Sequence, residues 1–181
     1  RPLVLFVGVA AFATGQVEDV FALDHPERVT KVAVVGSPIQ GSGLALLLKL
    51  SGNRQFAQLL YAVPWVLNSS IKLLSLTYAQ DWRTLWQLLS HSLSRTTVDS
   101  FSRSIHDLHH TDLSPRLSEC RVPAMGIYGR KDNIVSPKQA EVLRNGIADH
   151  TVHCFEASGH FPMLDETAHF HQAILDFLVD T

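Results

Sequence analysis

The sequence has 181 residues, of which 46% are hydrophobic, and its 15 lysines and arginines against 17 aspartates and glutamates give a formal net charge of −2. A chain of this size and composition can bury about 70% of its surface, which excludes an intrinsically disordered protein. The small net charge produces no field that would gather nucleic acid or an anionic membrane, so neither is an expected partner.

The two cysteines, Cys120 and Cys154, are isolated in the sequence and suggest neither a disulfide framework nor a paired metal site. We therefore expect a reducing, cytoplasmic compartment. The longest apolar stretches, residues 3–13 and 44–48, are shorter than the roughly 18 to 20 residues that span a bilayer. No charged region precedes the first stretch, so it is not predicted to be a signal peptide.

The first third of the chain has the pattern of a strand, a helix and a second strand. Residues 3–7 form a short apolar run rich in branched side chains, which is typical of a strand buried on both faces. Apolar residues at helical spacing predict a helix over 16–23, and 32–35 form a second buried strand that ends before Gly36. The pattern predicts a parallel βαβ unit.

A helical insertion is predicted to follow, from about residue 39 to residue 110. Four segments carry apolar residues three and four positions apart, namely 44–50, 56–62, 66–78 and 82–93. These helices could form a cap that lines a substrate pocket, or they could simply pack against one another. His106, His109 and His110 have a spacing that could hold a metal, but no carboxylate pattern accompanies them, and a solvated helix face is the preferred interpretation.

The α/β pattern then returns and brings two polar residues to the ends of strands. A strand over 123–129 leads to Asp132, and a short strand over 151–155 leads to His160. Helices are predicted over 137–147 and 166–179. Ligands bind outside the carboxyl ends of parallel strands, so Asp132 and His160 are candidate catalytic residues. The alternative is that they form an ion pair that only holds two loops together.

Several motifs in their expected order resemble the α/β-hydrolase superfamily over nearly the whole chain. The motifs are His25-Pro26-Glu27-Arg28-Val29 before a strand, Gly36-Ser37-Pro38 after it, Tyr128-Gly129-Arg130-Lys131-Asp132, and Ser158-Gly159-His160-Phe161-Pro162 with Glu166. The resemblance implies an α/β-hydrolase fold, with a mostly parallel sheet of which strands 5 to 8 are present. It also implies that Asp132 orients His160.

The same resemblance implies that Phe12 stands where the family has its serine nucleophile. A phenylalanine has no lone pair with which to attack a carbonyl, so acyl transfer through a serine is unavailable at this position. Thr14, the nearest hydroxyl, falls where the turn needs a small residue, and Glu18 is a second departure from the family pattern. Ser37 and Ser42 are interpreted as turn and cap residues.

A hydrolase frame without its nucleophile suits proton abstraction next to a carbonyl or imine. With phenylalanine at this position, the chain is similar to the peptide epimerase of bottromycin biosynthesis, which implies epimerisation of an aspartyl residue in a modified ribosomal peptide. One alternative is an esterase or lactonase whose nucleophile is displaced or replaced. The other is a catalytically silent module that binds an apolar ligand.

The expected site consists of two catalytic residues and a substrate pocket. The catalytic candidates are His160 and Asp132, and the pocket candidates are Phe12, Ala11, Ala13, Trp82, Trp86 and Phe161. No metal or cofactor is expected, and the partner is a small molecule or a modified peptide. The sequence leaves the oligomeric state open.

Three segments are predicted in the chain. Residues 1–38 and 111–181 form the α/β-hydrolase core, and residues 39–110 form the cap. Because the resemblance makes the first strand the fifth of an eight-stranded sheet, we expect these 181 residues to be the C-terminal part of a longer protein.

Overall fold

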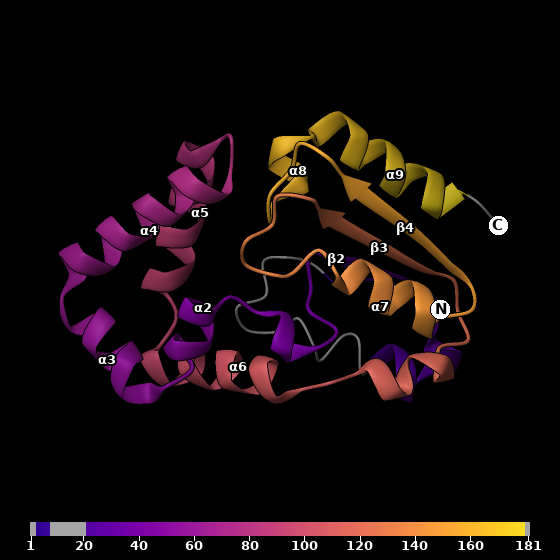
Figure 1. Cartoon of the computed structure of the whole chain (residues 1–181), viewed down its shortest axis with the longest axis horizontal. Coiled ribbons are helices and arrows are strands. Elements are labelled where there is room, and N and C mark those ends of the chain that lie inside the picture. Colours follow the sequence, from indigo (N-terminus) through magenta and orange to yellow (C-terminus); the bar gives the residue numbers. More distant parts are fainter. Residues whose placement is uncertain (1–2, 8–20, 180–181) are drawn as a thin grey trace.

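The computed structural model describes residues 3–7 and 21–179, and four parallel strands form its central sheet (Figure 1). The strands are β1 (Leu3–Val7), β2 (Val29–Val35), β3 (Ala124–Gly129) and β4 (His150–Phe155), and they lie side by side in chain order. Each of the four predicted strands is confirmed. β2 begins three residues earlier than predicted, because Val29 pairs with Leu3 of β1.

The two faces of the sheet bury alternate residues of β2, as the period of a β-strand requires. Val32 and Val34 pack into one hydrophobic cluster, whereas Ala33 and Val35 pack into the other. The first cluster is covered by helix α7 (Gln139–Gly146) and the second by helix α9 (Thr167–Val179). The inner strands β2 and β3 are thus buried on both faces, which explains the apolar run over 32–35 and the full burial of β3.

The connection between β2 and β3 carries a group of helices that lies to one side of the sheet, at the left of Figure 1. They are α2 (Leu46–Ser51), α3 (Arg54–Ala62), α4 (Pro64–Tyr78), α5 (Trp82–Ser94) and α6 (Val98–His110). We call these five helices the helical layer. Ala57 of α3 and Phe101 and Ile105 of α6 form its own small core.

Helix α6 was not among the helices predicted from the sequence. Its hydrogen-bonded start is fixed by Thr97, whose hydroxyl accepts a hydrogen bond from the backbone N–H of Ser100. Its buried apolar side chains are Phe101 and Ile105, one turn apart, and Val98 packs beside them. Because this apolar face is narrow, the sequence pattern alone was too weak to predict the helix.

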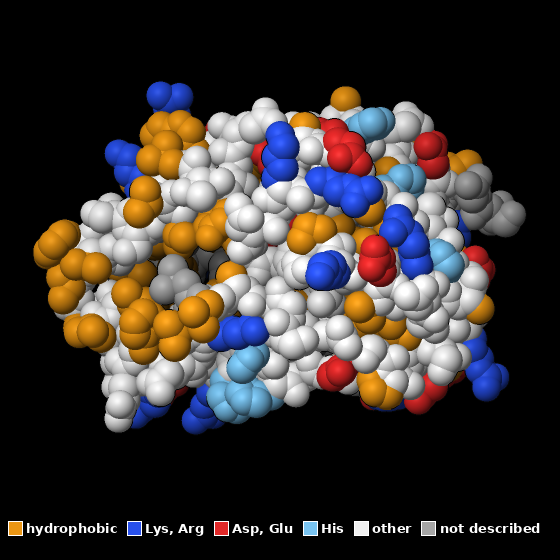
Figure 2. Space-filling model, in the orientation of Figure 1, with side chains coloured by type: hydrophobic (Ala, Val, Ile, Leu, Met, Phe, Trp, Pro, Cys, Tyr) orange, Lys and Arg blue, Asp and Glu red, His pale blue; other side chains and the backbone are white. Residues whose placement is uncertain are grey.

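The outer surface of the helical layer carries many exposed apolar side chains, which appear as orange patches at the left of Figure 2. They include Leu59, Trp65 and Leu73. None of the described helices alone has the length and hydropathy to cross a membrane. Helices α3 and α4 meet these limits only as a pair, and that pair is bent by 103° at its junction.

Short 3-10 turns complete the described chain, at Pro26–Arg28, Gly41–Gly43 and Ser114–Glu119. Helix α8 (Pro162–Asp165) is a single turn that precedes α9. Gly36 directly follows β2, and its φ of 58° lies in the left-handed region that favours glycine. The predicted helix over 16–23 falls largely outside the described residues, which include only its last turn.

Candidate active site

Asp132 lies in the loop that follows β3, and its carboxylate organises that loop. One oxygen, Oδ1, accepts hydrogen bonds from the backbone N–H groups of Ile134 at 2.7 Å and Val135 at 2.9 Å. These two bonds satisfy groups that the turn would otherwise leave unpaired, and they are typical of aspartate at the start of a turn. The second oxygen, Oδ2, is therefore left to face a different partner.

His160 lies in the loop that follows β4, and this loop is tied to the Asp132 loop through the backbone. The N–H of Lys131 donates to the carbonyl of Ser158, and the N–H of Arg130 donates to that of Phe155. Gly129 lets the two loops approach closely, since a Cβ at this residue would lie 1.9 Å from the carbonyl oxygen of Gly159. The parallel pairing of β3 and β4 thus brings two residues 28 positions apart to one edge of the sheet.

The two side chains form a buried hydrogen-bonded pair. Nδ1 of His160 lies 2.8 Å from Oδ2 of Asp132, and the side chains are 8% and 1% exposed. A carboxylate can only accept hydrogen bonds, so we assign the proton to Nδ1 and leave Nε2 of the neutral ring as a proton acceptor. Nε2 makes no hydrogen bond to any described residue. The arrangement is that of a histidine held in one tautomer and ready to accept or donate a proton.

Acidic side chains support the His160 loop from the start of the C-terminal helices. Glu166 Oε2 accepts hydrogen bonds from the hydroxyl of Ser158 at 2.6 Å and from the backbone N–H of Ala157 at 3.1 Å. Asp165 accepts from the N–H of Gly159 and, with its other oxygen, from the N–H of Gln80 between α4 and α5. Asp165 therefore links the loop that positions His160 to the connection between these two helices.

The support by Glu166 predicts a loss of stability in acid. The hydrogen bond from Ser158, followed by that from Ala157, lowers the pKa of the Glu166 carboxyl below its ordinary value of 4.5. A lowered folded-state pKa gives stability that is complete above pH 4.5 and is lost as the pH falls through the folded-state value. We expect the free energy of unfolding of the wild-type protein to exceed that of Glu166→Gln at pH 6, and the difference to shrink below pH 4.5.

Denaturant titrations at several pH values measure this effect. Glu141→Gln is a matched control, because Glu141 is exposed and its carboxylate forms no hydrogen bond to the described part of the chain. A gap between wild type and Glu166→Gln that is the same at pH 6 and pH 3 would contradict the assignment.

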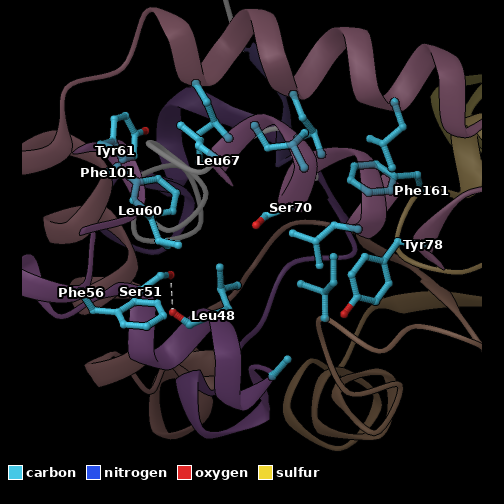
Figure 3. A pocket seen from close by; sticks show the side chains of 17 residues that line it. Leu48, Ser51, Phe56, Leu60, Tyr61, Leu67, Ser70, Tyr78, Phe101 and Phe161 are labelled. Atoms are coloured by element: carbon cyan, nitrogen blue, oxygen red, sulfur yellow. Dashed lines mark hydrogen bonds between the residues drawn. The ribbon is translucent and has the colours of Figure 1, made fainter. Parts of the chain in front are cut away.

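A cavity of about 200 Å³ lies between the helical layer and the sheet edge that carries the pair (Figure 3). Ile134 and Phe161, which are close in sequence to Asp132 and His160, line its wall on the sheet side. The other walls come mainly from helices α2 to α6 and are almost entirely aliphatic or aromatic. No lysine, arginine, aspartate or glutamate of the described chain lines it. Such a cavity suits a small, uncharged molecule.

The predicted pocket residues have different outcomes. Phe161 lines the cavity. Trp82 and Trp86 do not line it; instead, the Lys72 ammonium lies 5.8 and 5.9 Å from their ring centres, and Trp86 donates a hydrogen bond to Asn68. This cavity therefore gives no support to a pocket role for the two tryptophans, which amphipathic spacing alone had suggested.

The predicted nucleophile position and its neighbours, Phe12, Ala11 and Ala13, lie outside the described residues, as do Thr14 and Glu18. The histidine group of α6 is described. His106 and His110 stack with their ring centres 4.1 Å apart, and His110 Nδ1 hydrogen-bonds the carbonyl of His106. Within residues 3–7 and 21–179, no group of three or more histidine, cysteine or acidic side chains is arranged to hold a metal ion.

Sequence reasoning missed the residues of the helical layer that face the cavity, notably Tyr61, Ser70 and Phe101. The helical periodicity indicated that α3 and α4 each have an apolar face. It did not show which of the polar residues on these helices turn inward. Which polar residues turn inward depends on how the helices pack against one another, and the sequence of a single helix does not show this.

Comparison with known proteins gives relatives over most of the chain. No family model matches. The chain is 29% identical, over 166 residues, to the 2-hydroxy-6-oxononadienedioate/2-hydroxy-6-oxononatrienedioate hydrolases of Klebsiella pneumoniae and Escherichia coli. The match covers 87% of this chain and 57% of those enzymes. The chain thus spans little more than half the length of the curated relatives that it matches.

Solved structures match over still more of the chain. The enol-lactonase of Burkholderia xenovorans superposes with a TM-score of 0.71 at 16% identity, covering 93% of this chain and 64% of the lactonase. A meta-cleavage product hydrolase of Pseudomonas fluorescens superposes with a TM-score of 0.69 at 19% identity, covering 98% and 64%. The chain has the α/β-hydrolase fold. The resemblance predicted from the sequence motifs is confirmed at this level.

Proposed function

We propose that this chain carries the histidine and aspartate of an α/β-hydrolase active site, and that His160 moves a proton on a small, uncharged carbonyl compound bound in the adjacent cavity. The observation that carries the proposal is the buried hydrogen bond between His160 Nδ1 and Asp132 Oδ2 at the carboxyl edge of the sheet. Such a pair presents Nε2 as a base of fixed orientation.

Proton transfer is the proposed reaction because the resemblance of the sequence motifs to the α/β-hydrolases implies that Phe12 stands at the nucleophile's position. A phenylalanine side chain can neither attack a carbonyl nor pass a proton to His160. Abstraction of a proton next to a carbonyl needs no covalent intermediate, only a base and a group that stabilises the developing negative charge on oxygen. In this proposal Phe12 is a wall of the site.

Epimerisation of an aspartyl residue is a narrower form of the same proposal. It shares the proton abstraction, but its substrate carries a carboxylate. No cationic side chain of the described residues lines the cavity, so a carboxylate there would be buried without a partner. The same reasoning applies to the dienedioates named for the curated relatives. An uncharged substrate therefore fits the cavity better than either.

Hydrolysis is the second candidate, and the relatives favour it. Those named above are described as hydrolases or as a lactonase, and the order of Asp132 and His160 in the chain agrees with that of the α/β-hydrolase triad. This candidate needs a nucleophile other than residue 12, for which Thr14 is the nearest hydroxyl in the sequence.

Proton exchange in deuterated water tests the first proposal. We expect the protein to accelerate deuterium incorporation into the methyl group of acetophenone, measured by NMR, and His160→Gln to reduce that acceleration at least about 100-fold, since positioned bases contribute roughly 10² to 10⁴. His169→Gln, which changes an exposed histidine of α9, is the matched control and is expected to be without effect. Exchange no faster than in buffer would refute the proposal for neutral ketones.

Two further substrates separate the alternatives in the same experiment. Deuterium at the α-carbon of an aspartyl thiazoline peptide, without exchange on acetophenone, would favour the epimerase. Cleavage of p-nitrophenyl acetate that is lost in both His160→Gln and Thr14→Ala would favour hydrolysis through a displaced nucleophile. If Phe12→Ser creates ester cleavage that the wild-type protein lacks, the remaining triad residues are competent and the wild-type reaction is not acyl transfer.

A further inference from the structure

The cavity contains one polar atom whose state needs an explanation. The Tyr61 hydroxyl, on helix α3, is buried without a hydrogen-bond partner, and no other buried side-chain polar atom of the described residues shares this condition. The ring of Tyr61 packs against Phe101, with 6.0 Å between ring centres, so the side chain is held in place by apolar contacts alone. Figure 3 shows the hydroxyl at the end of the cavity formed by the helical layer.

A buried hydroxyl without a partner is unfavourable, because it loses its hydrogen bonds to water and gains none in return. Native proteins contain few such groups, and each has a reason. A phenylalanine would fill the same space without this cost. A ligand that accepts a hydrogen bond from the Tyr61 hydroxyl would explain why a tyrosine stands at this position.

A second hydroxyl lies on the same cavity. Ser70 of α4 lines the wall, and Figure 3 shows its oxygen turned toward the centre of the cavity. It makes no hydrogen bond to a described residue. Ser51, by contrast, is satisfied, since its hydroxyl donates to the carbonyl of Leu48 at 2.6 Å. Tyr61 and Ser70 thus each bring to the lining of this apolar cavity a hydroxyl without a hydrogen bond to a described residue, and of the two the Tyr61 hydroxyl is the buried one.

Water is a poor occupant of this site. A buried water needs two to four polar partners, and an apolar cavity of similar size stays dry and binds benzene instead. By that comparison, a volume of 200 Å³ admits a molecule of about eight to ten non-hydrogen atoms. Burial raises the pKa of the Tyr61 hydroxyl above its ordinary value of 10.0, so the group stays a proton donor at neutral pH.

We propose that Tyr61 is the recognition residue of this cavity, and that its hydroxyl donates a hydrogen bond to an oxygen atom of an uncharged, otherwise apolar ligand. Ser70 contributes a second, weaker contact. The substrate class that follows is a small aryl or alkyl compound with an oxygen that accepts a hydrogen bond, such as a ketone or an ether. This inference rests on the proposed function only in taking the cavity as the substrate site.

A pair of ligands of matched shape tests the inference without any turnover. Acetophenone and α-methylstyrene differ only in whether a carbonyl oxygen or a methylene group stands at one position. We expect Tyr61→Phe to weaken acetophenone binding about tenfold and to leave α-methylstyrene binding unchanged, as measured by NMR titration. Ser70→Ala should give the same pattern with a smaller change. Tyr128→Phe is the matched control and should leave both affinities unchanged, because the Tyr128 hydroxyl donates to the carbonyl of Ser37 and Tyr128 does not line the cavity.

Thermal unfolding of the ligand-free protein provides a second test, in which the same substitution is expected to stabilise the protein. Because the hydroxyl of Tyr61 has no partner, Tyr61→Phe should raise the unfolding midpoint by about 2 to 4 °C, whereas loss of a merely structural residue would lower it. A lowered midpoint, or equal loss of affinity for both ligands, would overturn the inference. Binding is measured in the wild-type protein without turnover, so a protein that binds acetophenone through Tyr61 but shows no deuterium exchange refutes only the proton-transfer proposal.

Discussion

Replacing Asp132 with asparagine is expected to lower the rate of the proposed proton transfer about a thousandfold while the protein stays folded. The amide oxygen of asparagine can still accept the two backbone hydrogen bonds from Ile134 and Val135. Its NH₂ group then faces Nδ1 of His160, and two donors cannot pair. The ring must therefore take the other tautomer, with its proton on Nε2, and it can no longer act as a base toward the substrate.

Comparison with alanine at the same position separates orientation from stability. Asp132→Ala leaves the two N–H groups and the buried imidazole without their acceptor, so we expect a loss of about 3 to 5 kcal/mol in the free energy of unfolding. Asp132→Asn should lose only about 1 to 2 kcal/mol by the same reasoning. Denaturant titration and the deuterium exchange assay measure the two effects. Equal stability losses for the two variants, or full activity in Asp132→Asn, would contradict the assigned hydrogen bonds.

Replacing Gly129 with alanine is the second change with a large expected effect, although Gly129 touches no substrate. The added Cβ would lie 1.9 Å from the carbonyl oxygen of Gly159 and 2.5 Å from that of Ser158. Both are backbone atoms of the loop that holds His160, so the loop must move by about 1.5 Å to reach an ordinary contact distance of 3.4 Å. We expect a loss of up to about 3 kcal/mol in stability and of at least about 100-fold in rate.

Gly126→Ala is the matched control for this prediction, because it adds the same atom to the same strand. At that position the Cβ would meet side-chain atoms of Leu143 and Tyr128 at 3.0 Å, and these side chains can shift without moving the catalytic loop. The rate should fall by less than about threefold, and the stability by about 1 kcal/mol. If the two alanine variants have the same rate, the close approach at Gly129 does not position His160.

The parallel sheet could be predicted from the sequence because its signal is local. Runs of branched apolar residues such as 3–7 and 32–35 are favourable only where both faces of a strand are buried, and the residues between them have helical spacing. Sequence neighbours in β2 enter opposite cores, as Val34 and Val35 do, and this follows from strand geometry alone. Helix α6 could not be predicted in this way, because its two buried apolar residues, Phe101 and Ile105, form too weak a helical pattern.

The pairing of Asp132 with His160 could also be predicted, but only with knowledge of the sheet. Each residue follows a predicted strand, and the carboxyl ends of neighbouring parallel strands meet at one edge. What the sequence left open was whether β3 and β4 are neighbours. Their register, which pairs Gly129 with Phe155, settles it and brings the two loops together.

The sequence by itself determined the strands, most of the helices, the order of the motifs and the two candidate catalytic residues, because each of these depends on residues close together in the chain. The cavity was decided by the tertiary structure. Tyr61, Ser70, Ile134 and Phe161 come from four different segments, and only the packing of the helical layer over the sheet edge brings them around one space. Trp82 and Trp86 have the same helical spacing as residues that line the cavity, yet their rings face the Lys72 ammonium instead. Amphipathic spacing states that one face of a helix is buried, and only the neighbouring helices determine what that face meets.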